Sequence, residues 1–180
     1  MKAESAPEIP DPYRAARGLS DEVQRVLRKR GNATIGTVNP NGTPHMAPVW
    51  FLFEKSGSAV YFECNSATRK ARNIEANGMA SVLAKGKRDD GNGLIVLGQG
   101  RARLIKGEEA REITARIRRK YMTAQGYEPV SAYLDTIDDA VAELKPEKWV
   151  AWSPARINDT IRSLPEYADG SWDKWFLPDE

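Results

Sequence analysis

The sequence ATIGTVNPNGTPHMAPVWFLF, residues 33–53, decides the fold of this chain. β-Branched residues dominate its first part, residues 33–38, and the Asn41-Gly42 pair supplies the positive φ angles of a tight turn. A second run of strand-forming residues extends from Pro44 to Phe53. The stretch therefore predicts a β-hairpin.

Further strand signals follow the hairpin. A turn at residues 55–58 leads into a strand at 59–64, so we expect the first three strands to form an antiparallel meander. Strand patterns return at the later ranges 80–84, 94–105 and 148–153. The sequence thus predicts six strands in all.

Helical patterns separate these strands. Ser20 can cap a first helix that Gly31 ends, and a second helix runs from Ser66 or Thr68 to Ala76, closed by Asn77-Gly78. Helical spacing also predicts helices at 108–121 and 131–144; in the latter, four apolar residues share one side, namely Leu134, Ile137, Val141 and Leu144.

The order of elements favours a mainly β fold with peripheral α-helices. Since strands and helices do not alternate regularly, a closed six-stranded antiparallel barrel with helices at its ends fits better than a parallel sheet. We expect an extended arm at residues 1–18, the barrel domain at 19–162 and a Trp-rich tail at 163–180. The aromatic tail is expected to pack on the barrel or on a partner subunit.

Composition excludes several classes of function. The chain has 180 residues with 41% hydrophobic and 29% charged residues, which suits one folded domain. Cys64 and His45 are the only residues of their types, so neither an internal disulfide nor a Cys/His zinc site can form, and we expect no metal. The absence of a G-x-S-x-G pattern disfavours a hydrolase. We expect Cys64 to be a small buried residue and His45 to have a structural or surface role.

Hydropathy and charge predict the surroundings of the protein. No apolar run approaches the ~18 residues of a membrane span, and residues 1–17 contain no apolar signal core, so a cytoplasmic location without membrane contact is expected. The net charge is only +2, but basic residues occur in clusters. This pattern favours local anion binding over broad coating of nucleic acid.

The segment NSATRKARNI, residues 65–74, carries the clearest chemical signal. It places hydroxyl groups and the adjacent Arg69 and Lys70 in the first turn of a helix, where free backbone amides and the helix dipole favour an anion. Arg and Lys together can neutralise a phosphate dianion. By spacing alone, an ordinary solvated helix start accounts for the same residues.

These stretches together resemble a known family. Residues 33–51, Val60-Tyr-Phe and residues 68–74 resemble the FMN-binding split-barrel superfamily, the pyridoxamine 5'-phosphate oxidase-like proteins, and within it the flavin/deazaflavin oxidoreductases most of all. Residues 98–105 resemble the family's next long strand, so the likeness extends over residues 33–119. It implies a homodimeric split barrel with cofactor sites at the subunit interface.

The resemblance also implies positions for the cofactor, either FMN or the deazaflavin coenzyme F-420. Residues along the tricyclic ring would be Pro48, Val49, Trp50 and Phe51, with Gln99 matching a ring-adjacent position only loosely. Phe62 and Glu63 would lie near the phosphate-ribityl arm, and the phosphate ligands would be Thr68, Arg69 and Lys70. No catalytic side chain is implied, because the cofactor supplies the redox chemistry. The expected substrate is a small conjugated or heteroaromatic molecule.

Several alternatives remain open from the residues. Trp50 and Phe51 could serve only as packing in an alternating strand. Lys85, Lys87 and Arg88 could extend a basic track for the longer anionic tail of coenzyme F-420. A haem- or bilin-handling protein would need His45 for an axial ligand in many haem sites. A non-catalytic anion- or nucleic-acid-binding barrel could instead use Arg101 and Arg103.

Overall fold

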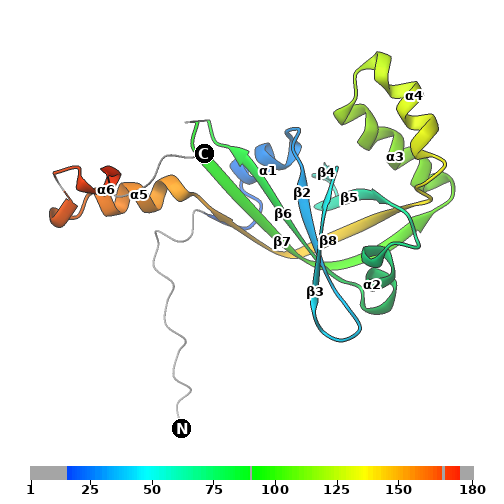
Figure 1. The fold of residues 1–180 in the computed structure, drawn as a ribbon, viewed down its shortest axis with the longest axis horizontal. Coiled ribbons are helices and arrows are strands. Elements are labelled where there is room, and N and C mark those ends of the chain that lie inside the picture. Colours follow the sequence, from blue (N-terminus) through cyan, green and yellow to red (C-terminus); the bar gives the residue numbers. More distant parts are fainter. Residues whose placement is uncertain (1–15, 90, 168, 175–180) are drawn as a thin grey trace, which may run out of the picture.

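The computed structural model describes residues 16–89, 91–167 and 169–174, and every structural statement below concerns these residues. The strands are β1 (Ala16–Arg17), β2 (Ala33–Val38), β3 (Pro44–Val49), β4 (Leu52–Glu54), β5 (Ala59–Cys64), β6 (Met79–Lys87), β7 (Gly93–Lys106) and β8 (Ala140–Trp152). The helices are α1 (Asp21–Arg28), α2 (Arg69–Asn77), α3 (Glu108–Tyr121), α4 (Ala124–Leu134), α5 (Pro154–Arg162) and α6 (Ser171–Lys174), with a 3₁₀ turn at Pro165–Tyr167. The fold is mainly β, as predicted (Figure 1).

The strands form one antiparallel sheet in the order β3-β2-β6-β7-β8-β5-β4, and the short β1 pairs with β8 beside this path. Its two outermost strands, β3 and β4, are consecutive in the chain and are separated only by Trp50 and Phe51. The sheet must therefore curl until its edges meet at this corner. Among the described strands, no ladder joins β3 to β4, so the chain itself closes the half-barrel.

The corner corrects two predictions. Residues 44–53 form two strands instead of one, so the count exceeds the expected six. Both antiparallel pairings expected of the meander are present, since β3 pairs with β2 and β4 with β5. A continuous three-stranded meander is nevertheless wrong, because β3 and β4 lie at opposite edges of the sheet. A strand that bends sharply at residues 50–51 can leave one edge of a sheet and rejoin the other.

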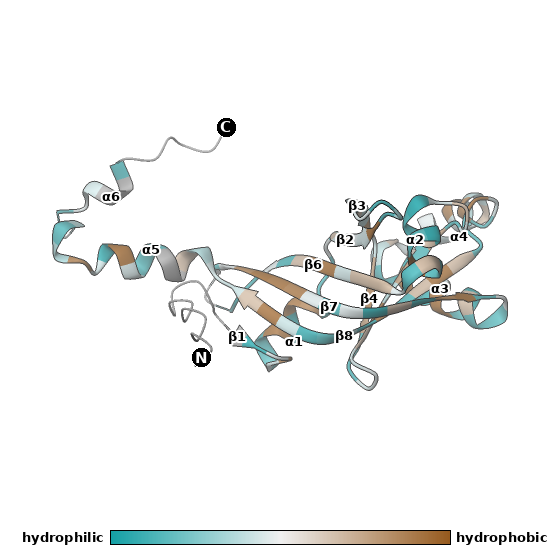
Figure 2. Ribbon diagram, turned by 90° about the horizontal axis from the view of Figure 1, so that it is seen from below, coloured by the Kyte–Doolittle hydropathy of each residue, from teal (hydrophilic) through white to brown (hydrophobic). Residues whose placement is uncertain are grey.

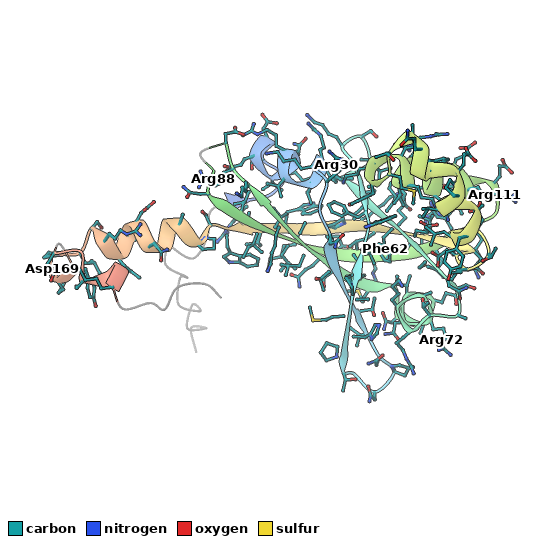
Figure 3. The ribbon with its side chains drawn as sticks, turned by 45° about the horizontal axis from the view of Figure 1, so that its top comes forward. Arg30, Phe62, Arg72, Arg88, Arg111 and Asp169 are labelled. Atoms are coloured by element: carbon teal, nitrogen blue, oxygen red, sulfur yellow. The ribbon has the colours of Figure 1, made fainter. Side chains whose placement is uncertain are left out.

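Alternating side chains build the interior. In β2 the buried residues are Ala33, Ile35 and Thr37, and in β6 they are Ala80, Val82 and Ala84, as the two-residue period of a strand requires. The apolar residues among them join Phe62, which is fully buried and lies within the body of the protein in Figure 3, in one core cluster. This core fixes which way each strand faces.

Helix α3 covers part of the outer face of the sheet. A second buried cluster lies there, containing Tyr61 of β5, Ile105 of β7, Val141 of β8 and Ile113 and Ile117 of α3. Most of β5 and the first part of β8 are consequently buried on both faces. α3 also reaches from this cluster toward the corner at residues 50–51, where its last residue, Tyr121, makes hydrogen bonds.

The local signals for the start of α1 and the end of α2 are confirmed. Ser20 accepts a hydrogen bond from the Val23 N–H at 3.3 Å, and Gly78 ends α2 in the left-handed region with φ 65°. α1 ends at Arg28, with Lys29 as its C-cap in extended conformation, so the helix ends three residues before Gly31, which is not its stop as predicted. The boundaries of α2 place its first turn directly after β5.

The predicted helix at 131–144 is wrong. α4 ends at Leu134, and β8 begins at Ala140, so Val141 and Leu144 lie in a strand. Residues 140–144 are all buried because the interior cluster covers one face and α3 covers the other. A strand buried on both faces loses the two-residue period, and its apolar spacing can match that of a helix.

The end of the described chain extends away from the barrel. α5 and α6 lie beyond the end of the long strands β7 and β8, opposite to the end where α3 and α4 lie (Figure 2). The predicted arm at 1–18 falls almost wholly outside the described residues, as do Trp175 and Phe176 of the predicted tail. In the described part of the chain, no helix has the length and apolar character needed to cross a membrane.

Candidate functional site

A cleft of about 570 Å³ lies beside the corner between β3 and β4. Five of the residues assigned to a cofactor line it, namely Pro48, Val49, Trp50, Glu63 and Lys70. They come from the β3 end, the corner, β5 and the first turn of α2. The closing of the sheet thus gathers residues that are separated by up to 22 positions in the sequence into one site.

One wall of the cleft is aromatic. The Trp50 indole stacks on the Tyr121 ring with centroids 5.0 Å apart and an interplanar angle of 5°. Trp50 remains 37% exposed, so much of its surface is open beside the cleft. Planar groups of a ligand gain by stacking on such a surface. Trp50 is therefore not packed wholly inside the core, and part of its ring surface lines the cleft.

The start of α2 also contributes to the cleft, through Lys70. Thr68 is the N-cap in extended conformation, yet its hydroxyl donates to the Asn65 carbonyl at 2.6 Å and makes no capping bond to the helix. The first turn contains Arg69 and Lys70 and no acidic residue. Two cations at the positive end of a helix dipole are unfavourable by themselves. An anion bound there would reverse this penalty.

The two cations face different spaces. Lys70 lines the cleft, whereas Arg69 lines a neighbouring pocket of about 470 Å³ together with Asn39, Asn41 and His45. The loop before α2 is held by Asp139, whose carboxylate accepts bonds from the Ser66 amide at 2.7 Å and the Ser66 hydroxyl at 2.6 Å. This bonding fixes where the first turn of α2 points.

Glu63 forms the acidic part of the cleft. Its carboxylate accepts hydrogen bonds from Arg118 of α3, and the two side chains are only 8% and 2% exposed. Burial raises the pKa of Glu63, while the Arg118 guanidinium opposes this shift. The pairing gives Glu63 a fixed position against the cleft.

The same arginine anchors α4. Arg118 donates to the Ser131 carbonyl at 3.1 Å and to the Asp135 carboxylate at 2.7 Å. Ser131 is the buried residue of α4, so this helix rests on few apolar contacts. Arg118 therefore joins β5, α3 and α4 around the cleft. No local pattern in the sequence marks it, because Glu63 lies 55 positions away.

Sequence reasoning missed the remaining lining residues. They are Asn32, Val130, Tyr133, Leu134 and Asp138. α4 supplies three of them, of which Tyr133 and Leu134 fall in the misassigned segment 131–144 and Val130 directly precedes it. Burial raises the pKa of Asp138, and the positive charges of Lys70 and Arg118 oppose this shift. The Lys70 charge thus acts inside the cleft.

The other five assigned residues lie outside the lining of the cleft, namely Thr68 and Arg69 at the start of α2, and Phe51, Phe62 and Gln99. Phe51 and Phe62 are 2% and 0% exposed and belong to the interior cluster. Phe51 still contributes its backbone to the corner, where its N–H and carbonyl bond to α3. Gln99 is exposed on β7, opposite Ser81 and Lys148 in the sheet, and lines neither pocket.

Among the other basic residues considered from the sequence, the side chains of Arg88, Arg101 and Arg103 have structural partners. Arg88 pairs with Glu22 at 2.7 Å, and the Lys87 carbonyl accepts a bond from Lys29 at 3.3 Å. Arg103 pairs with Glu143 at 2.5 Å. Arg101 donates to the Asn77 carbonyl at 3.2 Å. None of these residues lines the cleft in the described structure.

Together the fold and the site define a class of protein. A half-barrel that closes at a sharp corner presents an aromatic wall, a lysine from the first turn of a helix and a buried carboxylate to one cleft, with an arginine of the same turn in the neighbouring pocket. Such an arrangement can hold a planar ligand that carries an anionic group. It contains no triad of nucleophile, base and acid among its described lining residues.

The family follows from comparison with known proteins. The family model described as pyridoxamine 5'-phosphate oxidase matches residues 19–153. The chain belongs to this pyridoxamine 5'-phosphate oxidase-like split-barrel family, as its sequence predicted. The match includes the complete corner, α2 and the whole of β8. No curated protein matches the sequence.

Solved structures support the same fold. A conserved hypothetical protein, Rv2991 from Mycobacterium tuberculosis, is similar at 18% identity and TM-score 0.64, with 81% of this chain and 92% of that chain covered. An F420 reductase is similar at 19% identity and TM-score 0.51, covering 78% and 98%. A FAD-binding protein from Mesorhizobium loti is similar at 14% identity and TM-score 0.52, covering 76% and 95%. At these identities the likeness concerns the fold.

Proposed function

We propose that this protein is an oxidoreductase that holds a flavin-type cofactor, FMN or the deazaflavin coenzyme F-420, in the cleft beside Trp50. The observation that carries the proposal is the pairing of an aromatic wall with a cationic helix start across one cleft. The cleft volume of about 570 Å³ falls within the range of roughly 300–1,000 Å³ of ligand pockets. Family membership and neighbours named for F420 and FAD support the same class.

The first turn of α2 fits the phosphate. Its backbone amides receive no capping bond from Thr68, and Lys70 faces the cleft from the same turn. We assign Thr68, Arg69 and Lys70 to the phosphate, with Lys70 as the main cation and Arg69 approaching from the neighbouring pocket. The protein thus supplies charge and oriented amides at one end of the ligand.

The corner fits the ring. Trp50 offers an open aromatic surface, and Pro48 and Val49 continue the wall along β3. When bound, the cofactor would supply hydride or electron transfer. The residues of the chain position and shield the ring, and Glu63 presents a fixed carboxylate near the phosphate-ribityl arm. The apolar residues Val130, Tyr133 and Leu134 of α4 then define space for a small conjugated or heteroaromatic substrate.

The described chain leaves part of the site open. Trp50, Val130 and Tyr133 are 37%, 39% and 65% exposed around the cleft. A second subunit that covers these apolar residues would complete the site, and we therefore propose a homodimer with two interfacial cofactor sites. The separation of Lys85, Lys87 and Arg88 from the cleft lining favours FMN over the longer anionic tail of coenzyme F-420.

No observation favours the alternative functions. A haem protein of the kind considered above would need its axial histidine in the cleft, but His45 lines the neighbouring pocket. A nucleic-acid-binding barrel would use Arg101 and Arg103, which bond to Asn77 and Glu143. The residues on which the two alternatives were based, His45, Arg101 and Arg103, therefore lie or bond elsewhere.

The experiment is a cofactor screen with a matched pair of variants. Purified protein is titrated with FMN, FAD, coenzyme F-420 and haem, and binding is followed by absorbance and by the rise in Tm that a ligand of the folded state causes. We expect FMN or coenzyme F-420 to bind. Lys70→Ala should raise the Kd by about tenfold or more, since a charge-assisted bond contributes ~1.5–3 kcal/mol.

Arg72→Ala is the control, because Arg72 is an exposed cation on the outside of the same helix (Figure 3). It changes the net charge equally but should leave the Kd within about twofold, as expected for a screened surface charge. Tight haem binding without flavin binding, or equal effects of the two variants, would contradict the proposal.

A further inference from the structure

The backbone of the corner has no partner within the sheet. β3 ends at Val49 and β4 begins at Leu52, so residues 50 and 51 belong to no described ladder. The Phe51 side chain is 2% exposed, which places its peptide groups away from bulk water. Buried peptide groups must find hydrogen-bond partners elsewhere. The corner therefore depends on groups outside the sheet.

Tyr121, the last residue of α3, supplies one set of partners. Its hydroxyl accepts a hydrogen bond from the Phe51 N–H at 3.1 Å. The same hydroxyl lies 2.7 Å from the Gly31 carbonyl and 3.2 Å from the Phe51 carbonyl, to either of which it can donate its one proton. Gly31 precedes Asn32, which lines the cleft. One hydroxyl thus bonds next to two cleft residues, Asn32 and Trp50.

Lys120 supplies the second set. Its ammonium donates to the Phe51 carbonyl at 3.0 Å and to the Leu27 carbonyl in the last turn of α1 at 3.4 Å. It also lies 4.0 Å from the centre of the Phe51 ring. Burial lowers the pKa of Lys120 to about 8, so the amine is still mostly protonated at neutral pH. The end of α3 thereby joins α1 to the corner.

We propose that Tyr121 and Lys120 are positioning residues that clamp the corner and hold the Trp50 wall of the cleft in place. Tyr121 acts on the wall twice, through the Phe51 amide and through the ring stack with Trp50. This role rests on the proposed function only where it concerns cofactor affinity. The clamp itself is defined by contacts within the chain.

The experiment measures the corner directly. Amide hydrogen exchange is followed in a peptide covering residues 49–53 of Tyr121→Phe, which keeps the stacked ring and removes the hydroxyl. Losing a buried hydrogen bond should speed exchange of the Phe51 amide by about tenfold. The FMN Kd should rise several-fold because the ring wall is less ordered. Tyr127→Phe on α4 is the control, and should change neither quantity.

Lys120→Met is a second variant that keeps the Tyr121 bonds and the apolar stem. It should also speed exchange in the 49–53 peptide and weaken FMN binding. Unchanged exchange in both variants would overturn the clamp, and faster exchange with unchanged FMN affinity would overturn its role in positioning the wall. If both variants exchange faster than wild type, but wild type itself binds no flavin, the clamp is supported and the proposed function is refuted.

Discussion

Replacing Arg118 by Met should destabilise the protein strongly. Arg118 is 2% exposed and neutralises Glu63, which is 8% exposed. Removing one partner of a buried ion pair leaves an uncompensated charge and typically costs ~3–5 kcal/mol. The variant also removes the bonds to Ser131 and Asp135, although Asp135 is 67% exposed and can regain water. For a domain of this size we expect Tm to fall by about 6–20 °C.

The pH dependence gives this prediction a distinctive signature. Burial raises the pKa of Glu63, so the folded state penalises the ionised carboxylate. Without Arg118, which opposes that shift, the pKa must rise further. At a pH below the ordinary carboxyl pKa, Glu63 is protonated in both the folded and the unfolded state, so the loss of Arg118 adds no penalty for a buried negative charge. Above the pKa that Glu63 has in the folded variant, this penalty is complete. The stability difference between wild type and variant should therefore shrink as the pH falls toward the ordinary value.

Thermal unfolding between pH 5 and 8 measures this difference, with Arg111→Met as the control. Arg111 is an exposed residue of the same helix, at the periphery of the molecule in Figure 3. Its replacement should stay within about 0.5 kcal/mol of wild type. Limited proteolysis should cut near α4 first in Arg118→Met. An Arg118→Met variant as stable as Arg111→Met, or equally destabilised at every pH, would refute the reasoning.

Two further predictions concern the interior. Gly98→Ala should cost ~1–3 kcal/mol in a urea titration, because a Cβ there would lie 2.7 Å from the buried Trp149 ring, whereas Gly93→Ala meets nothing within 4 Å and should be nearly neutral. A steep loss of stability in Gly93→Ala alone would contradict this. Cys64 is 1% exposed and burial raises the pKa of its thiol to about 12, so it should resist a thiol reagent at pH 8 until urea unfolds the chain.

The parts of the fold with strong local chemistry could be predicted from the sequence. The Ser20 cap and the Gly78 stop lie where their backbone preferences indicated. The hairpin also turns at Asn41-Gly42, although in this pair Gly42 (φ 83°) takes a positive φ and Asn41 does not. Each depends on contacts within a few residues, so no tertiary information was needed. The same holds for the cationic first turn of α2, which its position after β5 directs toward the cleft.

The parts that depend on covering layers could not be predicted. β8 resembles a helix in sequence because α3 buries its outer face, and Glu143 is tolerated there through Arg103 and Tyr61. The break at Trp50 reflects sheet closure, which no local pattern records. The α4 wall of the cleft was missed for the same reason as β8, since the two share one misassigned segment.

The central claim is that the start of α2 binds the phosphate of a ring stacked beside Trp50. The most direct test compares the Kd of FMN with that of riboflavin, which lacks the phosphate, in wild type and in Lys70→Ala. We predict that wild type prefers FMN by at least about tenfold and that Lys70→Ala loses most of this preference while riboflavin binding hardly changes. Equal affinities for FMN and riboflavin in wild type, or a preference that survives Lys70→Ala intact, would contradict the account.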